Sequence, residues 1–350
     1  MSVFIDFHVL QTVPPSCVNR DDMGSPKTAV YGGAVRARVS SQAWKRAMRE
    51  EFKTLFDEYD LGSRTKNMVE MVGREIIRLD SSISIDESRK KAAKALESAG
   101  IKLKDEKAEA LFFMSNKQAR AIAELAITLD PKDKETPKRM KEALKASPSV
   151  DIALFGRMAA SEATLNYDAA AQVAHAISTH AVQNEYDYFT AVDDLQTEEN
   201  AGAGHLGTIE FNSSTLYRYA TVNAIELAKT LGKESVAGAV KKFCQAFVIS
   251  MPTGKENTFA NRTFPDMVYI TLRSDQPVNL CGAFENPIKK SDKGYASASE
   301  SRLMEYAQKV YSQFAAKPDE EWLNDISSEL SLPELLSQLE KAVNDRMTEV

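Results

Sequence analysis

Basic residues gather in one short stretch of an otherwise acidic chain. Between residues 19 and 49 the sequence holds seven Lys or Arg residues against two Asp residues, so this stretch carries a net charge of +5. The whole chain of 350 residues carries −6 at pH 7. Such a distribution favours selective contact with a polyanion, because the remaining surface repels nonspecific binding. The basic residues are Arg20, Lys27, Arg36, Arg38, Lys45, Arg46 and Arg49.

The order of residues in this stretch suits phosphate binding. Arg36 and Arg38 are two residues apart, so both side chains point the same way if the segment is extended. The run Ser40-Ser41-Gln42 follows where a helix is expected to begin, and it offers hydroxyl, amide and free backbone N–H donors. The same helix would extend the positive field through Lys45, Arg46 and Arg49.

Acidic pairs in the sequence allow a second, catalytic interpretation. Asp21 with Asp22, and Asp193 with Asp194, could bind Mg²⁺ for phosphodiester cleavage. Aspartates in such loops more often orient neighbouring arginines or cap turns. We therefore expect a protein that is not an enzyme, and a metal-dependent ribonuclease that uses a loop aspartate is the alternative.

Other motifs for cofactors or metals lack their structural context. Residues 202–207 spell GxGxxG, but acidic residues precede the motif and no helix is expected after it, so we expect an exposed loop. His175 and His180 are five residues apart and would not share one helix face as zinc ligands do. The three cysteines lie far apart and form no CxxC pair. We expect no metal and no cofactor.

The basic stretch requires a strand, a loop and a helix to position it. Residues 3–10 alternate as a strand does, and a loop punctuated by Pro and Gly leads to a short strand that ends at Val39. Ser40 and Ser41 then open a helix. Its core-facing stripe is expected to consist of Trp44, Met48, Phe52 and Leu55.

The remaining chain combines a helical insertion with further strands. Residues 60–149 are rich in Lys, Glu and Ala and include the expected helical stretches 88–97, 105–129 and 136–146. Strand signals return at 216–220 and 267–273, with helices from Asn223 and over 235–247 between them. A capping box at Ser331 and Glu334 opens a C-terminal helix. The pattern predicts an α+β fold with a split βαβ core, as in RNA-recognition sheets.

The composition excludes several protein classes. The chain is 43% hydrophobic and 27% charged, which is typical of a packed globular protein. It has no run of about 18 apolar residues and no basic region before its first apolar segment. We therefore expect a cytoplasmic protein that neither spans nor binds a membrane.

Several long, ordered motifs occupy residues 16–23, 31–33, 38–42, 45–49, 150–158, 174–177, 189–195 and 205–208. They resemble the CasC family, the backbone subunits of type I-E CRISPR Cascade surveillance complexes. The resemblance extends from the start of the chain to about Phe284, and the helical insertion and C-terminal region share only the family's general character.

The resemblance implies a hand-shaped subunit. It would have an RRM-like (ferredoxin-like) palm, a helical fingers insertion at residues 59–150 and a thumb loop at 191–214. The palm would comprise 1–58, 151–190 and 215–350, the last with C-terminal helices. Family members stack as a filament along one guide RNA (crRNA) and hold its phosphates and sugars, while base pairing with target DNA supplies specificity in antiviral defence. Further copies and other Cascade subunits would be the protein partners.

The resemblance also assigns roles to individual positions. Residues that would line the guide backbone are Arg20, Lys27, Arg38, Ser40, Gln42, Lys45, Arg46 and Arg49. Apolar residues that would displace a nucleotide beside the thumb are Met158, Phe189 and Leu206. Fingers lysines that would hold duplex DNA are Lys138, Lys141 and Lys145; Lys134 shares their spacing, but Pro137 would leave it outside the helix. The alternative for these lysines is a solvated face.

Overall fold

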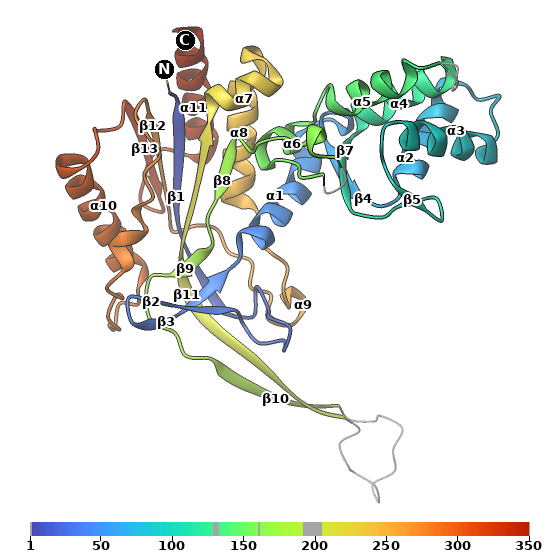
Figure 1. Ribbon diagram of the computed structural model, residues 1–350. Helices are drawn as coiled ribbons and strands as arrows, with labels where there is room; N and C mark the ends of the chain where they lie inside the picture. Colours follow the sequence, from blue (N-terminus) through green and yellow to red (C-terminus); the bar gives the residue numbers. More distant parts are fainter. Residues whose placement is uncertain (1, 129–132, 160–161, 192–204, 350) are drawn as a thin grey trace, which may run out of the picture. The chain divides into compact units, whose positions relative to one another are not determined.

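A computed structural model describes residues 2–128, 133–159, 162–191 and 205–349 (Figure 1). The chain divides into two compact units. The first, which we call the sheet unit, comprises Met1–Met48, Val173–Thr221 and Phe243–Leu339. The second, which we call the helical unit, comprises Arg49–Gln172, Val222–Lys242 and Glu340–Val350. No helix in the described ranges combines the length and apolar character needed to cross a bilayer.

A nine-stranded sheet organises the sheet unit. Its strand order is β13-β12-β1-β11-β9-β3-β2, and β8 and β10 also pair with β11. Strands β1 and β12 pair antiparallel, from Phe4 opposite Arg273 to Leu10 opposite Met267. The strands are β1 (Phe4–Ser16), β2 (Thr28–Tyr31), β3 (Ala34–Val39), β8 (Ala171–Val173), β9 (Ala176–Ser178), β10 (Glu185–Ala191), β11 (His205–Asn223), β12 (Met267–Arg273) and β13 (Glu320–Asp325).

Helices cover both faces of this sheet. On one face, Phe7 of β1 packs against Phe243 of α8 (Lys233–Ile249), with ring centroids 5.4 Å apart. On the same face, Trp44 of α1 (Ser41–Leu55) packs under the guanidinium of Arg218 at 3.7 Å. The other face packs Leu10 against α10 (Ala296–Gln313) and the short helix η4 (Leu280–Phe284). The sheet is therefore buried on both sides, which fixes the strands that lead into the basic stretch.

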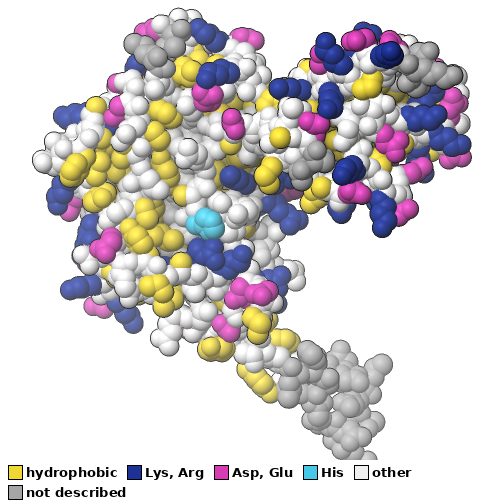
Figure 2. All heavy atoms as spheres, viewed as in Figure 1, with side chains coloured by type: hydrophobic (Ala, Val, Ile, Leu, Met, Phe, Trp, Pro, Cys, Tyr) yellow, Lys and Arg dark blue, Asp and Glu magenta, His cyan; other side chains and the backbone are white. Residues whose placement is uncertain are grey.

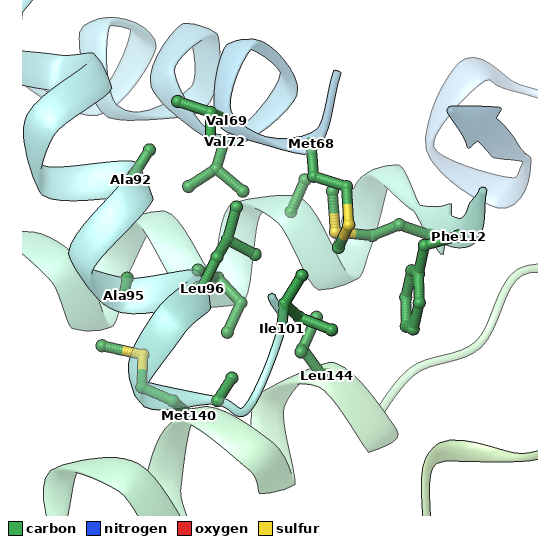
Figure 3. Packing of buried hydrophobic residues seen from close by; sticks show 14 of the residues in the cluster. Met68, Val69, Val72, Ala92, Ala95, Leu96, Ile101, Phe112, Met140 and Leu144 are labelled. Carbon is green, nitrogen blue, oxygen red and sulfur yellow. The ribbon is translucent and has the colours of Figure 1, made fainter. Parts of the chain in front are cut away.

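Four helices build the core of the helical unit. They are α2 (Met68–Leu79), α3 (Ile85–Ser98), α4 (Asn116–Thr128) and α5 (Thr136–Lys145). Met68, Leu96 and Leu144 meet in its centre, as Figure 3 shows. Further elements are η1 (Glu58–Asp60), β4 (Gly62–Thr65) paired with β7 (Phe112–Ser115), β5 (Leu103–Lys104) paired with β6 (Lys107–Ala108), α6 (Val150–Phe155) and η2 (Ala163–Leu165). The structure also contains α7 (Ala224–Leu231) in the helical unit, α9 (Glu256–Phe259) in the sheet unit, and α11 (Leu332–Glu349), which begins in the sheet unit and ends in the helical unit.

Most expected elements are confirmed, and one is partly wrong. The mixed α+β class, the strands at 3–10, 216–220 and 267–273 and the helix from Ser41 are present. The expected helix over 105–129 begins only at Asn116. Residues Asp105 and Glu106 adopt positive φ angles of 51° and 58° and turn β5 into β6, and without a glycine that turn leaves little trace in the sequence.

Candidate nucleic-acid interface

Seven of the eight residues expected to contact the guide backbone belong to the sheet unit. They lie on the loop after β1, on β3 and on the first two turns of α1. Arg20, Gln42 and Arg46 are exposed, Lys27, Arg38 and Lys45 are partly exposed, and Ser40 is buried. Figure 2 shows Lys and Arg side chains gathered beside a histidine on the face in view. We call the seven expected guide contacts of the sheet unit the basic surface: Arg20, Lys27, Arg38, Ser40, Gln42, Lys45 and Arg46.

Asn19 ties the loop of the basic surface to the helix and strand beside it. Its side-chain oxygen accepts the backbone N–H of Ser40 at 2.9 Å, and its carbonyl accepts the N–H of Lys27 at 2.9 Å. The carbonyl of Lys27 in turn accepts the N–H of Arg38 at 2.9 Å. The hydroxyl of Ser40 accepts the N–H of Ala43 at 3.3 Å and so caps α1. Asn19 thus holds Lys27, Arg38 and Ser40 in one place, although it is not among the residues expected to contact the guide.

A neutral histidine orients Arg38. The guanidinium of Arg38 donates to the carbonyl of Thr28 at 3.1 Å and lies 3.1 Å from Nδ1 of His175. Burial lowers the pKa of His175, and the charges of Arg38 and Lys27 lower it further. At neutral pH the imidazole is therefore uncharged and can accept from Arg38. Sequence reasoning considered His175 only as a metal ligand and missed this contact.

His175 and His180 have unrelated surroundings, and neither lies on a helix. His180 stacks on Tyr295 with ring centroids 3.6 Å apart, and its Nε2 accepts the backbone N–H of Thr215 at 3.1 Å. Among the residues that the structure describes, no group of three or more His, Cys, Asp or Glu could hold a metal ion.

The expectation that Arg36 joins Arg38 in binding phosphate is wrong. Arg36 is fully buried. Its guanidinium donates to the carbonyls of Ser178 and Phe284, each at 2.8 Å, and of Glu285 at 3.3 Å. The reason is the position of β3 inside the sheet, where β9 and η4 cover the side chain. Arg36 is a structural anchor.

Asp21 forms the turn of the loop. One of its carboxylate oxygens accepts the backbone N–H groups of Met23 at 3.0 Å and Ser25 at 2.9 Å. Asp22 is exposed beside it. Asp21 therefore caps this turn, as aspartates in such loops commonly do.

A distant loop also supports the basic surface. Gly254 lies so close to this loop that a Cβ there would be 2.1 Å from the carbonyl oxygen of Val18. Lys255 follows it with a φ of 52°. The charges of Arg20 and Lys255 both act to lower the pKa of the Cys17 thiol, although burial raises it overall. Lys255 therefore brings a further cation near Arg20, which no local sequence signal could have revealed.

Comparison with known proteins identifies the family. The CT1975-like protein family matches residues 5–348. The chain belongs to this family. A chain of a solved structure described as "CRISPR RNA-guided surveillance complex, pre-nicking" is 34% identical, with a TM-score of 0.85, and the match covers 97% of this chain and 100% of that chain. A chain of a "CRISPR RNA-guided surveillance complex" is 30% identical, with a TM-score of 0.64, over 98% and 99% of the two chains. No curated protein matches significantly.

In this CT1975-like protein Arg49 differs from the rest of the expected backbone contacts. It belongs to the helical unit, where Nε donates to Asp151 at 3.0 Å and Nη2 donates to the carbonyl of Gly62 at 3.0 Å. Its guanidinium also lies over the ring of Phe113 at 4.5 Å. Only 21% of the side chain is exposed. Arg49 therefore has a structural role in addition to any contact with a ligand.

The residues expected to displace a nucleotide are described in part. Met158 is 83% exposed in the helical unit. Phe189 is 38% exposed on β10 and lies opposite Gly207 of β11, where a Cβ would be 2.3 Å from its ring. The side chain of Leu206 lies outside the described residues, as do residues 192–204 of the expected thumb. The ribbon of β10 and β11 leads to that segment (Figure 1).

The fingers lysines lie on or next to α5. Lys138 and Lys145 are exposed, whereas Lys141 pairs with Glu162 at 2.7 Å. Pro137 lies in the first turn of α5 and Lys134 precedes the helix, as expected.

Proposed function

We propose that this CT1975-like protein is a guide-RNA-binding backbone subunit of a type I-E Cascade complex. The observation that carries the proposal is the basic surface, whose donors are held on a buried sheet by Asn19 and His175. Its cations and polar side chains suit phosphates and sugars. Such contacts position a strand without reading its bases, so one surface can hold any spacer sequence. The similarity to chains of surveillance complexes supports the same conclusion.

The arrangement of the sheet unit supports its assignment to an RRM-like palm. Four neighbouring strands, in the order β12-β1-β11-β9, form its centre. Helices α1 and α8 cover one face through Trp44, Phe243 and Phe247. A four-stranded sheet with two helices on one face is the ferredoxin-like arrangement. The helical unit would correspond to the fingers.

Filament assembly is the second part of the proposal. Met158 is an exposed apolar side chain, and leaving such surface in water favours a partner on assembly. A neighbouring copy and a splayed nucleotide would cover it together with Phe189 and Leu206, since wedge residues stabilise unstacked bases. Leu206→Asp should leave the melting temperature unchanged and abolish ordered assembly on guide RNA. Markedly earlier melting would show instead that Leu206 is ordinary core.

The protein is proposed to have no catalytic activity. Asp21 is committed to its turn, which supports this assignment over the metal-dependent ribonuclease. Purified protein should therefore leave guide RNA and paired target intact in Mg²⁺ or Mn²⁺. Cleavage that disappears in Asp22→Ala would establish the ribonuclease.

Contacts with target DNA and with other Cascade subunits complete the proposal, in the cytoplasm. Lys138 and Lys145 are exposed and free to face duplex DNA, whereas Lys141 would have to leave Glu162. Expression of the full chain with a CRISPR array and its partner subunits tests the proposed function most broadly. We expect a discrete guide RNA to co-purify, and recovery of the protein without RNA would contradict the proposal.

A further inference from the structure

A large polar cavity lies wholly within the helical unit. Its volume is about 720 Å³, and its walls come from the second half of α1, β4, α2 and the start of α6. Four of the cations that line it are ion-paired with carboxylates that also line it, and Arg74 with Glu70 is one such pair. Most of the charge in the cavity is therefore already balanced.

Arg64 is the exception among these cations. Its guanidinium lies over the ring of Phe113 at 4.9 Å, and Arg49 lies over the same ring at 4.5 Å. Within the described ranges Asp151 pairs with Arg49, but no carboxylate lies within ion-pair distance of Arg64. One positive charge at this aromatic ring therefore has no counter-charge in contact with it.

Arg64 is exposed, and it lies near both a like charge and an opposite charge. Burial lowers the pKa of Arg64, the neighbouring charge of Arg49 lowers it further, and the charge of Asp151 raises it and so offsets part of this effect. An anion beside the two guanidiniums would relieve this repulsion, and a planar guanidinium matches two oxygens of a phosphate. Glu58 lines the cavity and has no ion pair with the residues that the structure describes, so it is the carboxylate that would compete with such an anion.

We propose that Arg64, stacked on Phe113 beside Arg49, binds one phosphodiester of a nucleic-acid strand in this cavity. The guanidinium of Arg64 is exposed, and no carboxylate in the described ranges contacts it, so its N–H groups can donate to the oxygens of a phosphodiester. Asp151 is a positioning residue here, because it holds Arg49 while leaving Arg64 free for the ligand. The proposal rests on the proposed function, and it adds a contact in the helical unit to those of the basic surface.

The test compares two arginines of the same cavity. Full-length wild type, Arg64→Gln and Arg74→Gln are titrated with a fluorescent 30-nucleotide oligouridylate between 0.05 and 0.3 M salt. For Arg64→Gln we expect the slope of log K against log salt to fall in magnitude by about 0.7, and affinity at 0.1 M salt to fall about fivefold. Arg74→Gln should bind within twofold of wild type, because its charge is balanced by Glu70.

Further variants separate this inference from the proposed function. Arg64→Lys keeps the charge and should restore most of the slope, which a purely structural role would not do. An unchanged slope in folded Arg64→Gln overturns the phosphate site, while a wild type that binds no oligouridylate overturns the proposed function itself. Inorganic phosphate, at constant ionic strength, should not displace the strand below about 10 mM, since a free ion lacks the other contacts. Displacement at lower concentrations would instead assign the cavity to free phosphate and overturn the proposal.

Discussion

Removal of the Asp151 carboxylate should destabilise the helical unit strongly. The side chain is only 2% exposed. It accepts Nε of Arg49 at 3.0 Å, the N–H of Gly62 at 3.0 Å and the hydroxyl of Ser149 at 2.6 Å. Asp151→Ala removes all three hydrogen bonds at once and leaves a guanidinium, a backbone N–H and a hydroxyl without this acceptor.

The expected magnitude follows from the burial of this ion pair. Removing one partner of a fully buried pair costs about 3–5 kcal/mol. Arg49 keeps 21% of its side chain exposed, so water replaces part of the lost interaction. We therefore expect a loss of about 2–4 kcal/mol in the free energy of unfolding. In a unit of this size that loss lowers the melting temperature by roughly 5–15 °C.

Urea unfolding of Asp151→Ala, Arg49→Ala and the double variant measures this loss. The double-mutant cycle should give a coupling energy of about 1–3 kcal/mol between the two residues. Glu70→Ala is the matched control, because its carboxylate pairs with Arg74 at the surface, where such pairs contribute less than about 1 kcal/mol. A loss below about 0.5 kcal/mol in Asp151→Ala, or a coupling energy near zero, would refute the reasoning.

Two further predictions concern the sheet unit. Gly254→Ala should lower the free energy of unfolding by about 1–3 kcal/mol and weaken RNA binding, because its Cβ would lie 2.1 Å from the carbonyl oxygen of Val18. The control is Gly238→Ala on α8, where the added Cβ would meet only Glu340 at 4.0 Å. This variant should leave the free energy of unfolding unchanged or raise it. Equal losses of that free energy in both variants would contradict the account. Burial, together with the charge of Arg273, lowers the pKa of His8 to about 3. Between these two pKa values, about 3 in the folded chain and about 6.5 in the unfolded chain, only the unfolded chain binds a proton at His8. The free energy of unfolding of wild type should therefore fall by about 1 kcal/mol per pH unit between pH 6 and 4, relative to His8→Phe. Parallel pH profiles for these two proteins would show that His8 titrates normally.

Local patterns predicted the elements but not which side chains remain free. The strand at 3–10 and the helix from Ser41 follow from periodicity and a helix cap, both of which are local. The sequence pattern does not distinguish Arg36 from Arg38. In the folded chain, however, Arg36 is buried and donates to the carbonyl of Phe284. The roles of Arg36 and Arg38 therefore could not be separated from sequence.

Contacts between distant segments supplied the rest of the candidate site. His175 reaches Arg38 from 137 positions away, and Gly254 packs against the loop that contains Val18. Strand β13 was missed because its pattern is mostly polar and only Trp322 is buried. These features depend on which strands become neighbours in the sheet, and local spacing carries no record of that.

The salt dependence of RNA binding tests the central claim most directly. Wild type and the double variant Lys45→Ala/Arg46→Ala are titrated with single-stranded RNA, beside Lys309→Ala/Lys317→Ala, which makes the same change in net charge away from the basic surface. We predict that the Lys45→Ala/Arg46→Ala slope falls in magnitude by about 1.4 and that the control slope does not change. Equal slopes for wild type and Lys45→Ala/Arg46→Ala would contradict the assignment of the basic surface to the guide RNA.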